Sequence, residues 1–226
     1  MLTRIRSNPS RIGEGGMTLL EIIVVLAVIG LLAAALMPMV LGYLEDAKKS
    51  KAEGEVRVIA AALAKLTKDL RHFPAYTGTK NSGKADIELL CSAGSLPQVI
   101  ATGWPTFTAT TDCKEAGGKV DALENILIKN TPLGDGTPFN TTDRSKGQWQ
   151  GPYGDRFVAD PWERAYVVNI KNGEVFTGDP AYPESLKKVI WVLSAGPNGV
   201  IDTPADSLST SGELFPGGDD IAIRIK

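Results

Sequence analysis

A run of 23 residues without a charged side chain, residues 22–44, constrains this chain more than any other feature. An α-helix rises about 1.5 Å per residue, so the run is long enough to cross the ~30 Å hydrocarbon core of a membrane. A secretory signal peptide and a simple membrane anchor also contain such a run, and the three alanines at 33–35 mimic a signal-peptide cleavage site. The run therefore predicts contact with a membrane but leaves its purpose open.

The apolar run continues into a second pattern that belongs to the same predicted helix. Apolar residues recur at spacings of 4, 3, 4, 3, 4 and 3, which is one helical face: Ala52, Val56, Ile59, Leu63, Leu66, Leu70 and Phe73. No linker rich in Gly and Pro intervenes, so we predict one helix from near Thr18 to His72, closed by Pro74. A signal peptide or a plain anchor does not explain this amphipathic half. Pro38 lacks a backbone donor and is expected to kink or locally open the helix.

Glu21 places a carboxylate at the start of the apolar segment, and two explanations are open. The residues T-L-L-E at 18–21 fit a capping box, with Thr18 as N-cap and Glu21 reaching back, and a carboxylate suits the positive end of a helix dipole. Alternatively Glu21 has a positive partner, because an unpaired charge in a bilayer costs several kcal/mol. The available partner is the α-amino group that a cut between Gly16 and Met17 would create.

A short basic leader ending in Gly16, followed by M-T-L-L-E and a long apolar helix, resembles the N-terminus of type IV prepilins and pseudopilins. The family usually has Phe where this chain has Met17. The resemblance implies cleavage after Gly16 by a prepilin peptidase and N-methylation of Met17. It also implies that Glu21 pairs with the Met17 amine of a neighbouring subunit during filament assembly, and Pro38 matches the family's helix-melting proline.

The fold class that we predict is α+β, type IV pilin-like, with the long helix packed on a small antiparallel β-sheet. Strands are expected within 165–170, 188–194 and 220–226, with a hairpin turn at the Asn-Gly pair 172–173, and short helices within 85–90 and 120–129. The expected division is a cleaved leader (1–16), a transmembrane and filament-core helix (17–44), an amphipathic helix (45–74), a variable insertion (75–150) and a C-terminal sheet with an acidic loop (151–226).

Four short motifs in the globular part resemble the major pseudopilin of type II secretion systems in particular. They are G-P-Y at 151–153, D-P-W at 160–162 followed by Tyr166, S-A-G-P-N-G at 194–199 and D-D-I at 219–221. Glu163 and Ala165 replace the Gly and Pro that the family usually has after the tryptophan. We interpret Trp162 as a packing residue in a turn rather than a ligand-binding residue.

The resemblance implies a structural subunit, not an enzyme, that polymerises into a periplasmic filament for protein export. Its partners would be copies of itself, the prepilin peptidase, minor pseudopilins and an inner-membrane assembly platform. The chain would cross the inner membrane once, with its globular part in the periplasm. A type IV pilin of a surface fibre, for adhesion, motility or DNA uptake, is the alternative, and a membrane-anchored periplasmic enzyme is a weaker one.

Composition and motifs exclude several function classes. The formal net charge is −2, and no basic patch interleaves with aromatic residues, which argues against a nucleic-acid partner. The motifs G-x-S-x-G, H-E-x-x-H and the phosphate-binding P-loop are absent from the sequence. The single histidine, His72, lies at the predicted end of the helix, where it suits the negative end of the dipole.

An acidic loop precedes the last predicted strand. Five carboxylates and no Lys or Arg lie between 199 and 220: Asp202, Asp206, Glu213, Asp219 and Asp220. Ca²⁺ binds six to eight oxygens of carboxylates and carbonyls, although solvated acidic loops are common. The family resemblance implies a calcium site made of the Ala195 and Val200 carbonyls, the Asn198 side chain, Asp219 and Asp220. Asn198 stands where the family usually has Asp, and Asp202 is a candidate to replace the missing charge.

Cys91 and Cys113 lie 22 residues apart, without a C-x-x-C motif, so a zinc site is not expected. They are either two unrelated buried thiols or one disulfide. Because disulfides persist outside the cytoplasm, a periplasmic globular part favours the disulfide.

Overall fold

The computed structural model describes residues 17–71, 73–74, 87–105, 113, 119–134, 138–139, 141–142, 147–170, 190–205 and 216–225. Gly16, His72, the turn at 172–173, Asp206 and Glu213 lie outside the described residues. The chain divides into two units, Met1–Glu45 and Asp46–Lys226.

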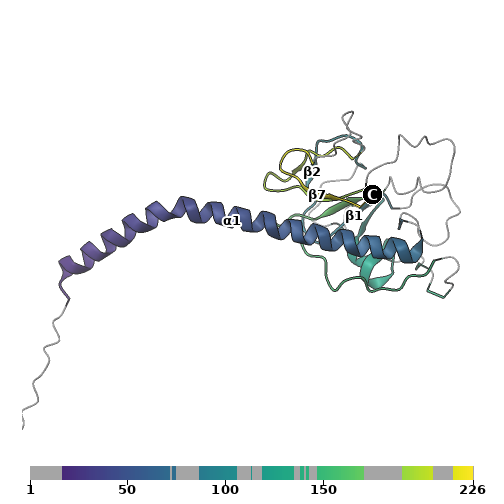
Figure 1. Ribbon diagram of the computed structural model, residues 1–226, viewed down its shortest axis with the longest axis horizontal. Coiled ribbons are helices and arrows are strands. Elements are labelled where there is room, and N and C mark those ends of the chain that lie inside the picture. The colour runs from purple at the N-terminus through teal and green to yellow at the C-terminus, as the bar shows by residue number, and fades with distance from the viewer. Residues whose placement is uncertain are drawn as a thin grey trace, which may run out of the picture. The chain divides into compact units, whose positions relative to one another are not determined.

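One helix, α1, extends over Leu19–Leu70, as the two apolar patterns predicted (Figure 1). It continues through Pro38 without a break, because a proline removes only one of the many backbone hydrogen bonds that hold a long helix. Its apolar side chains from Leu19 to Leu44 are exposed in the isolated chain. Among the described residues, α1 is the helix that is long and apolar enough to cross a membrane.

The second half of α1 buries the face that the 4-3 spacing predicted. Its buried residues are Ala52, Val56, Ile59, Ala60, Ala62, Leu63, Leu66 and Leu70. They form one hydrophobic cluster with residues of the sheet such as Leu90, Val168 and Val192. Each leucine that is fully removed from water here stabilises the fold by about 1.5–3 kcal/mol.

A five-stranded sheet with the order β3-β1-β4-β5-β7 covers this helix face. The strands are β1 (Leu89–Cys91), β3 (Val120–Ala122), β4 (Val167–Asn169), β5 (Trp191–Ser194) and β7 (Ile221–Arg224). The pairs β1·β4, β4·β5 and β5·β7 are antiparallel, and the predicted strands near 167, 191 and 221 are confirmed. A separate parallel pair joins β2 (Gln98–Val99) to β6 (Val200–Ile201).

Two expectations about the insertion are wrong. Residues 89–91 form β1 rather than part of a helix, and β1 pairs in parallel with β3, so the sheet is mixed rather than antiparallel. Leu89 and Cys91 lie in one hydrophobic cluster and Leu90 in the other, an alternation that only a strand allows. Residues 120–129 divide into β3 and a π-helix, η2 (Asn125–Lys129), instead of one helix.

Asp121, in β3, is hydrogen-bonded to residues on both sides of η2 as well as to the side chain of Asn125 at its start. Its buried carboxylate accepts hydrogen bonds from the Ala122 N–H, the Asn125 Nδ2 and the Leu133 N–H, each at 2.7 Å. These bonds connect the end of β3 to the segment that follows η2. Burial raises the pKa of the Asp121 carboxyl, and these three donors partly oppose that rise.

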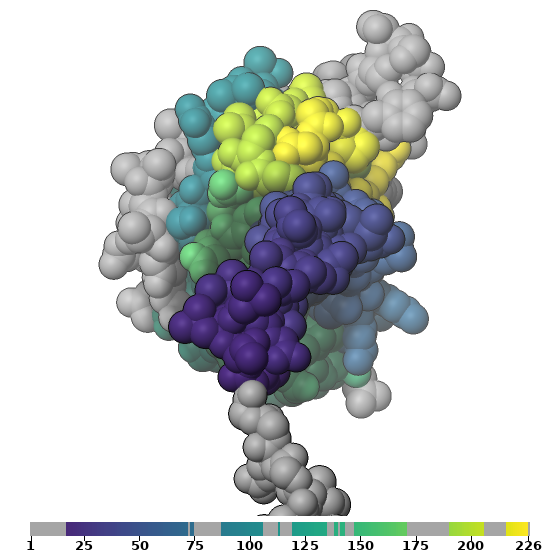
Figure 2. Space-filling view, turned by 90° about the vertical axis from the view of Figure 1, so that its left-hand side faces the viewer, coloured from purple at the N-terminus to yellow at the C-terminus, as the bar shows by residue number. Residues whose placement is uncertain are grey.

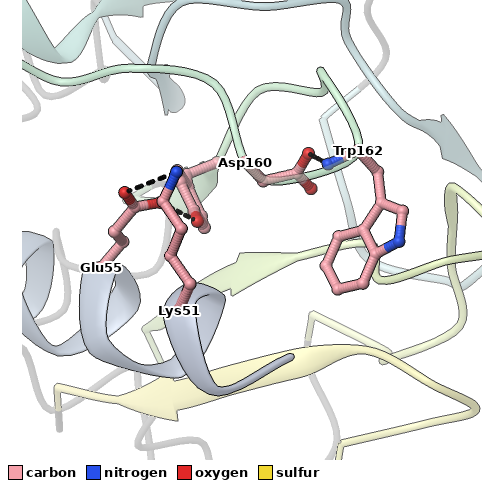
Figure 3. Close-up of polar contacts among 5 residues, drawn as sticks. Lys51, Glu55, Asp160 and Trp162 are labelled. Atoms are coloured by element: carbon pink, nitrogen blue, oxygen red, sulfur yellow. Dashed lines mark hydrogen bonds and ion pairs between the residues drawn. The ribbon is translucent and has the colours of Figure 1, made fainter. Parts of the chain in front are cut away.

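Two tyrosine–carboxylate hydrogen bonds attach the second half of α1 to the globular part. The Tyr166 hydroxyl donates to Glu55 Oε2 at 2.5 Å, and Lys51 lies 3.8 Å from the other Glu55 oxygen (Figure 3). Near the end of the helix the Tyr153 hydroxyl donates to Asp69 Oδ2 at 2.9 Å. These contacts define where α1 lies along the sheet, since apolar packing alone tolerates sliding.

The Tyr153–Asp69 contact predicts a loss of stability in strong alkali. Burial, together with the Asp69 carboxylate, raises the pKa of Tyr153 to about 12, against about 10 in an unfolded chain. Because the folded pKa is the higher one, the stabilisation is complete below about pH 10 and is lost as the pH rises towards 12. The free energy of unfolding, measured with denaturant in detergent, is expected to fall less between pH 8 and pH 11 in Tyr153→Phe than in the wild type. Equal losses would contradict this assignment.

Candidate functional site

The start of α1 contains the capping box that the sequence suggested. The Glu21 N–H donates to Thr18 Oγ1 at 3.2 Å, and the Thr18 N–H donates to Glu21 Oε2 at 3.4 Å. Met17 and Glu21 are both exposed in the isolated chain. Among the described residues, the Glu21 carboxylate accepts two long, solvent-exposed hydrogen bonds, both from Thr18, which leaves its charge available to another group.

Two loops meet at the C-terminal edge of the sheet, where β5 and β7 lie side by side. One loop follows β5, contains Ala195 and Asn198 and leads into β6 at Val200, and the other precedes β7 and contains Asp219 and Asp220. Figure 2 shows their surfaces, residues 190–205 in yellow-green and 216–225 in yellow, in contact on one face of the molecule. The five residues of the expected calcium site thus lie in two neighbouring segments, with Asn198 and Asp219 in direct contact.

Asp220 is the most buried of the described carboxylates in these two loops, with 8% of its surface exposed. Its Oδ2 accepts hydrogen bonds from the Asp202 N–H at 2.9 Å, the Thr203 N–H at 2.7 Å and the Thr203 hydroxyl at 2.6 Å. Its Oδ1 is buried and has no hydrogen-bond partner among the described residues. Burial raises the pKa of the Asp220 carboxyl, and the nearby Asp202 charge adds to this effect.

Asp219 and Asn198 join the two loops directly. The Asn198 N–H donates to Asp219 Oδ2 at 2.9 Å, and Asn198 Oδ1 accepts from the Val200 N–H at 2.6 Å. The Ala195 carbonyl accepts from the Gly199 N–H at 3.2 Å. The expected ligand atoms are therefore all oxygens of irregular backbone or short side chains, which is the donor chemistry that Ca²⁺ prefers.

The donor set suits calcium in part. The orphaned Oδ1 of Asp220 is a buried anionic oxygen that a cation would satisfy. Within the described ranges, however, no three His, Cys, Asp or Glu side chains are grouped closely enough to hold a metal ion. A cation at these loops would consequently depend on amide and carbonyl oxygens as well as carboxylates.

The D-P-W turn supports the loop after β5 from the other side. Buried Asp160 accepts from the Trp162 N–H at 2.9 Å (Figure 3) and from the Ser194 hydroxyl at 2.6 Å. Arg164 donates from Nη1 to the carbonyls of Gly196 at 2.7 Å and Pro197 at 3.3 Å. Trp162 is partly buried and packs against the core, as predicted.

Two backbone positions show how closely the turn and the loop are fitted. Gly199 has φ +74°, and a Cβ there would lie 2.1 Å from the Arg164 guanidinium carbon, so only glycine fits. Glu163 has φ +66°, a conformation that favours the glycine usual in the family at this position. A residue with a side chain in this conformation costs conformational strain.

Cys91 and Cys113 are joined by a disulfide, with their Cα atoms 5.9 Å apart. Both are buried, at 0% and 2% exposure, in the cluster on the sheet face opposite α1. The bond connects β1, a strand with a partner on each side, to a segment 22 residues away in the sequence.

Sequence reasoning missed Arg164, Thr203 and Ser194, which position the two loops. Their signals are weak, since each is a single polar residue whose partner lies far away, as in the 32 residues between Arg164 and Gly196. The D-P-W motif was the one available indication, because an Asp before a turn commonly accepts backbone hydrogen bonds.

Two known proteins are similar to this chain. Type II secretion system core protein G of Escherichia coli strain K12 is 38% identical over 88 residues, which cover 39% of this chain and 56% of that protein. Type II secretion system core protein G of Pseudomonas aeruginosa is 39% identical over 62 residues, covering 27% of this chain and 44% of that protein. The chain thus matches about half the length of each relative.

No protein-family model and no solved structure matches the chain. The two relatives agree with the resemblance that the N-terminal and loop motifs indicated.

Proposed function

We propose that this chain is a non-enzymatic pseudopilin subunit that polymerises into the periplasmic filament of a type II secretion system. The observation that supports it most is the 38–39% identity to two core G proteins of that system. The apolar first half of α1 agrees with this role, because its exposed side chains need either lipid or neighbouring helices. The chain crosses the inner membrane once, and its globular part lies in the periplasm.

Processing creates the charge partner that assembly uses. A prepilin peptidase cuts after Gly16, and the new amino group of Met17 is methylated. In the membrane Glu21 of one subunit attracts the Met17 amine of the next, and the low dielectric makes both the attraction and the cost of an unpaired charge large. The pair therefore favours assembly and a defined axial stagger, while the apolar side chains of α1 provide the packing.

The loops at the end of the sheet bind Ca²⁺ in this proposal. The ligands are the Ala195 and Val200 carbonyls, the Asn198 side chain, Asp219 and Asp220. Bound Ca²⁺ would neutralise the buried Asp220 carboxylate, and would stabilise the folded state by mass action without taking part in any reaction. The orphaned Asp220 Oδ1 is the feature of this chain that supports the site.

The function is tested by deleting the gene in its own host and comparing secreted proteins with surface fibres. We expect loss of folded exoproteins from the medium, their accumulation in the periplasm, and restoration by the wild-type gene. Normal secretion together with the loss of a surface fibre, of adhesion or of DNA uptake would contradict a pseudopilin and indicate a type IV pilin. Intact secretion and intact fibres would contradict both.

A further inference from the structure

We propose that Asp202 provides the carboxylate that the calcium site lacks at position 198, so that Asn198 and Asp202 serve as one shared ligand position. This inference rests on the calcium site proposed above. It concerns this chain's own residues, because Asn198 is neutral and cannot supply the charge itself.

Asp202 lies next to Asn198 in the structure. Asn198 Nδ2 donates to Asp202 Oδ2 at 3.3 Å, across a turn of four residues. The neutral amide and the carboxylate are thus within one hydrogen bond of each other. A negative charge is present beside position 198, although it comes from a different residue.

The loop before β7 is shaped around the Asp202 carboxylate. Gly218 has φ +54°, and a Cβ at this position would lie 2.2 Å from Asp202 Oδ2. A Cβ at Gly217 would lie 2.6 Å from the Asp202 carbonyl oxygen. Two consecutive glycines therefore leave the space that this residue occupies, and any larger residue would displace it.

Asp202 also connects to the buried carboxylate that lacks a partner. Its own N–H donates to Asp220 Oδ2 at 2.9 Å, which places the two residues against each other. Asp220 is more than nine-tenths buried, and its Oδ1 has no partner in the described part of the chain. A buried carboxylate oxygen with no donor beside it is a position that a bound cation would satisfy.

The charge of the site follows from these contacts. Asp219 and Asp220 alone offer two negative charges, and Asp202 raises the number to three. Ligand charge and rigidity are what tune calcium affinity in proteins. Since the described carboxylates are not grouped as a metal site in the metal-free chain, the proposal includes a rotation of the half-exposed Asp202 side chain away from Asn198 when Ca²⁺ binds.

The test is calorimetric titration of the full-length protein in detergent with Ca²⁺, and with Mg²⁺ as a second probe. We expect Asp202→Asn to weaken Ca²⁺ binding on the order of tenfold, in line with the dependence on ligand charge. The double variant Asn198→Asp/Asp202→Asn is expected to regain wild-type affinity, because it returns the charge to position 198. Asp155→Asn removes an exposed carboxylate elsewhere and serves as the charge-matched control, with no change expected.

The outcomes separate this inference from the calcium site itself. A wild type that binds no Ca²⁺ would overturn both. Ca²⁺ binding by the wild type with unchanged affinity in Asp202→Asn would overturn the role of Asp202 alone. The melting temperature of the metal-free protein provides a further check, because the Asp202 N–H bond to Asp220 survives the substitution. If Asp202→Asn lowered the melting temperature without metal as much as it does in Ca²⁺, the role of Asp202 would be purely structural and the inference would be overturned.

Discussion

A Glu21→Val variant is expected to remain in the membrane but to be absent from filaments. Within the described part of the chain, the Glu21 carboxylate accepts hydrogen bonds only from Thr18, at 3.4 and 3.5 Å, so its removal is expected to leave α1 intact. In the filament, the Glu21→Val substitution would leave the Met17 amine of a neighbouring subunit charged and unpaired in hydrocarbon. Each such unpaired amine costs several kcal/mol. Recovery with a tagged wild-type subunit from sheared filaments measures incorporation.

Two controls separate charge pairing from helix capping. Thr18→Ala removes the cap at a cost of about 1 kcal/mol and is expected to reduce incorporation only slightly. Glu53→Val removes an exposed carboxylate of the same helix, which lies 3.7 Å from Arg57, and is expected to incorporate normally. If Thr18→Ala and Glu21→Val failed to the same degree, capping would account for Glu21. Normal incorporation of Glu21→Val would remove the pairing mechanism.

Loss of the Cys91–Cys113 bond is expected to destabilise the globular unit by about 3 kcal/mol, the chain-entropy value for a loop closed over 22 residues. Cys91→Ser, Cys113→Ser and the double variant are expected to lose the same free energy of unfolding, because either substitution removes the same disulfide. Denaturant unfolding of the full-length protein in detergent measures the loss, and reductant is expected to lower the stability of the wild type but not of the variants. Two free thiols in protein taken from the periplasm would contradict the disulfide.

The sequence predicts the long helix more completely than it predicts the short strands. The helix α1 was predictable because one period holds along its buried face, from Ala52 to Leu70, and because an unbroken apolar run precedes it. β5 and β7 were predictable from short β-branched runs. β1 and β3 were not, because three residues give no usable period and their parallel pairing joins residues 31 positions apart, such as Leu89 and Val120.

The expected calcium ligands came from the family resemblance and stay a prediction, whereas the residues that support the two loops gave no signal in the sequence. Of these expected ligands, Asn198 and Asp219 are in direct contact in the structure. The hydrogen bonds from Arg164 and Ser194 depend on tertiary distance, which local patterns do not contain. Tyr166 likewise reaches Glu55 across 111 residues, a contact that follows from the packing of α1 on the sheet rather than from either local sequence.

Thr203 has a consequence for how freely the chain can be lengthened. Its hydroxyl accepts from the Gly217 N–H at 2.9 Å and donates to Asp220, so side-chain hydrogen bonds hold the stem of the 204–216 excursion shut. Because these bonds hold the two ends of the segment together, each doubling of its length adds only about 0.6 kcal/mol to the free-energy cost of closing the loop. Insertions or deletions between residues 203 and 217, including an inserted peptide label, are therefore expected to leave the flanking strands in place.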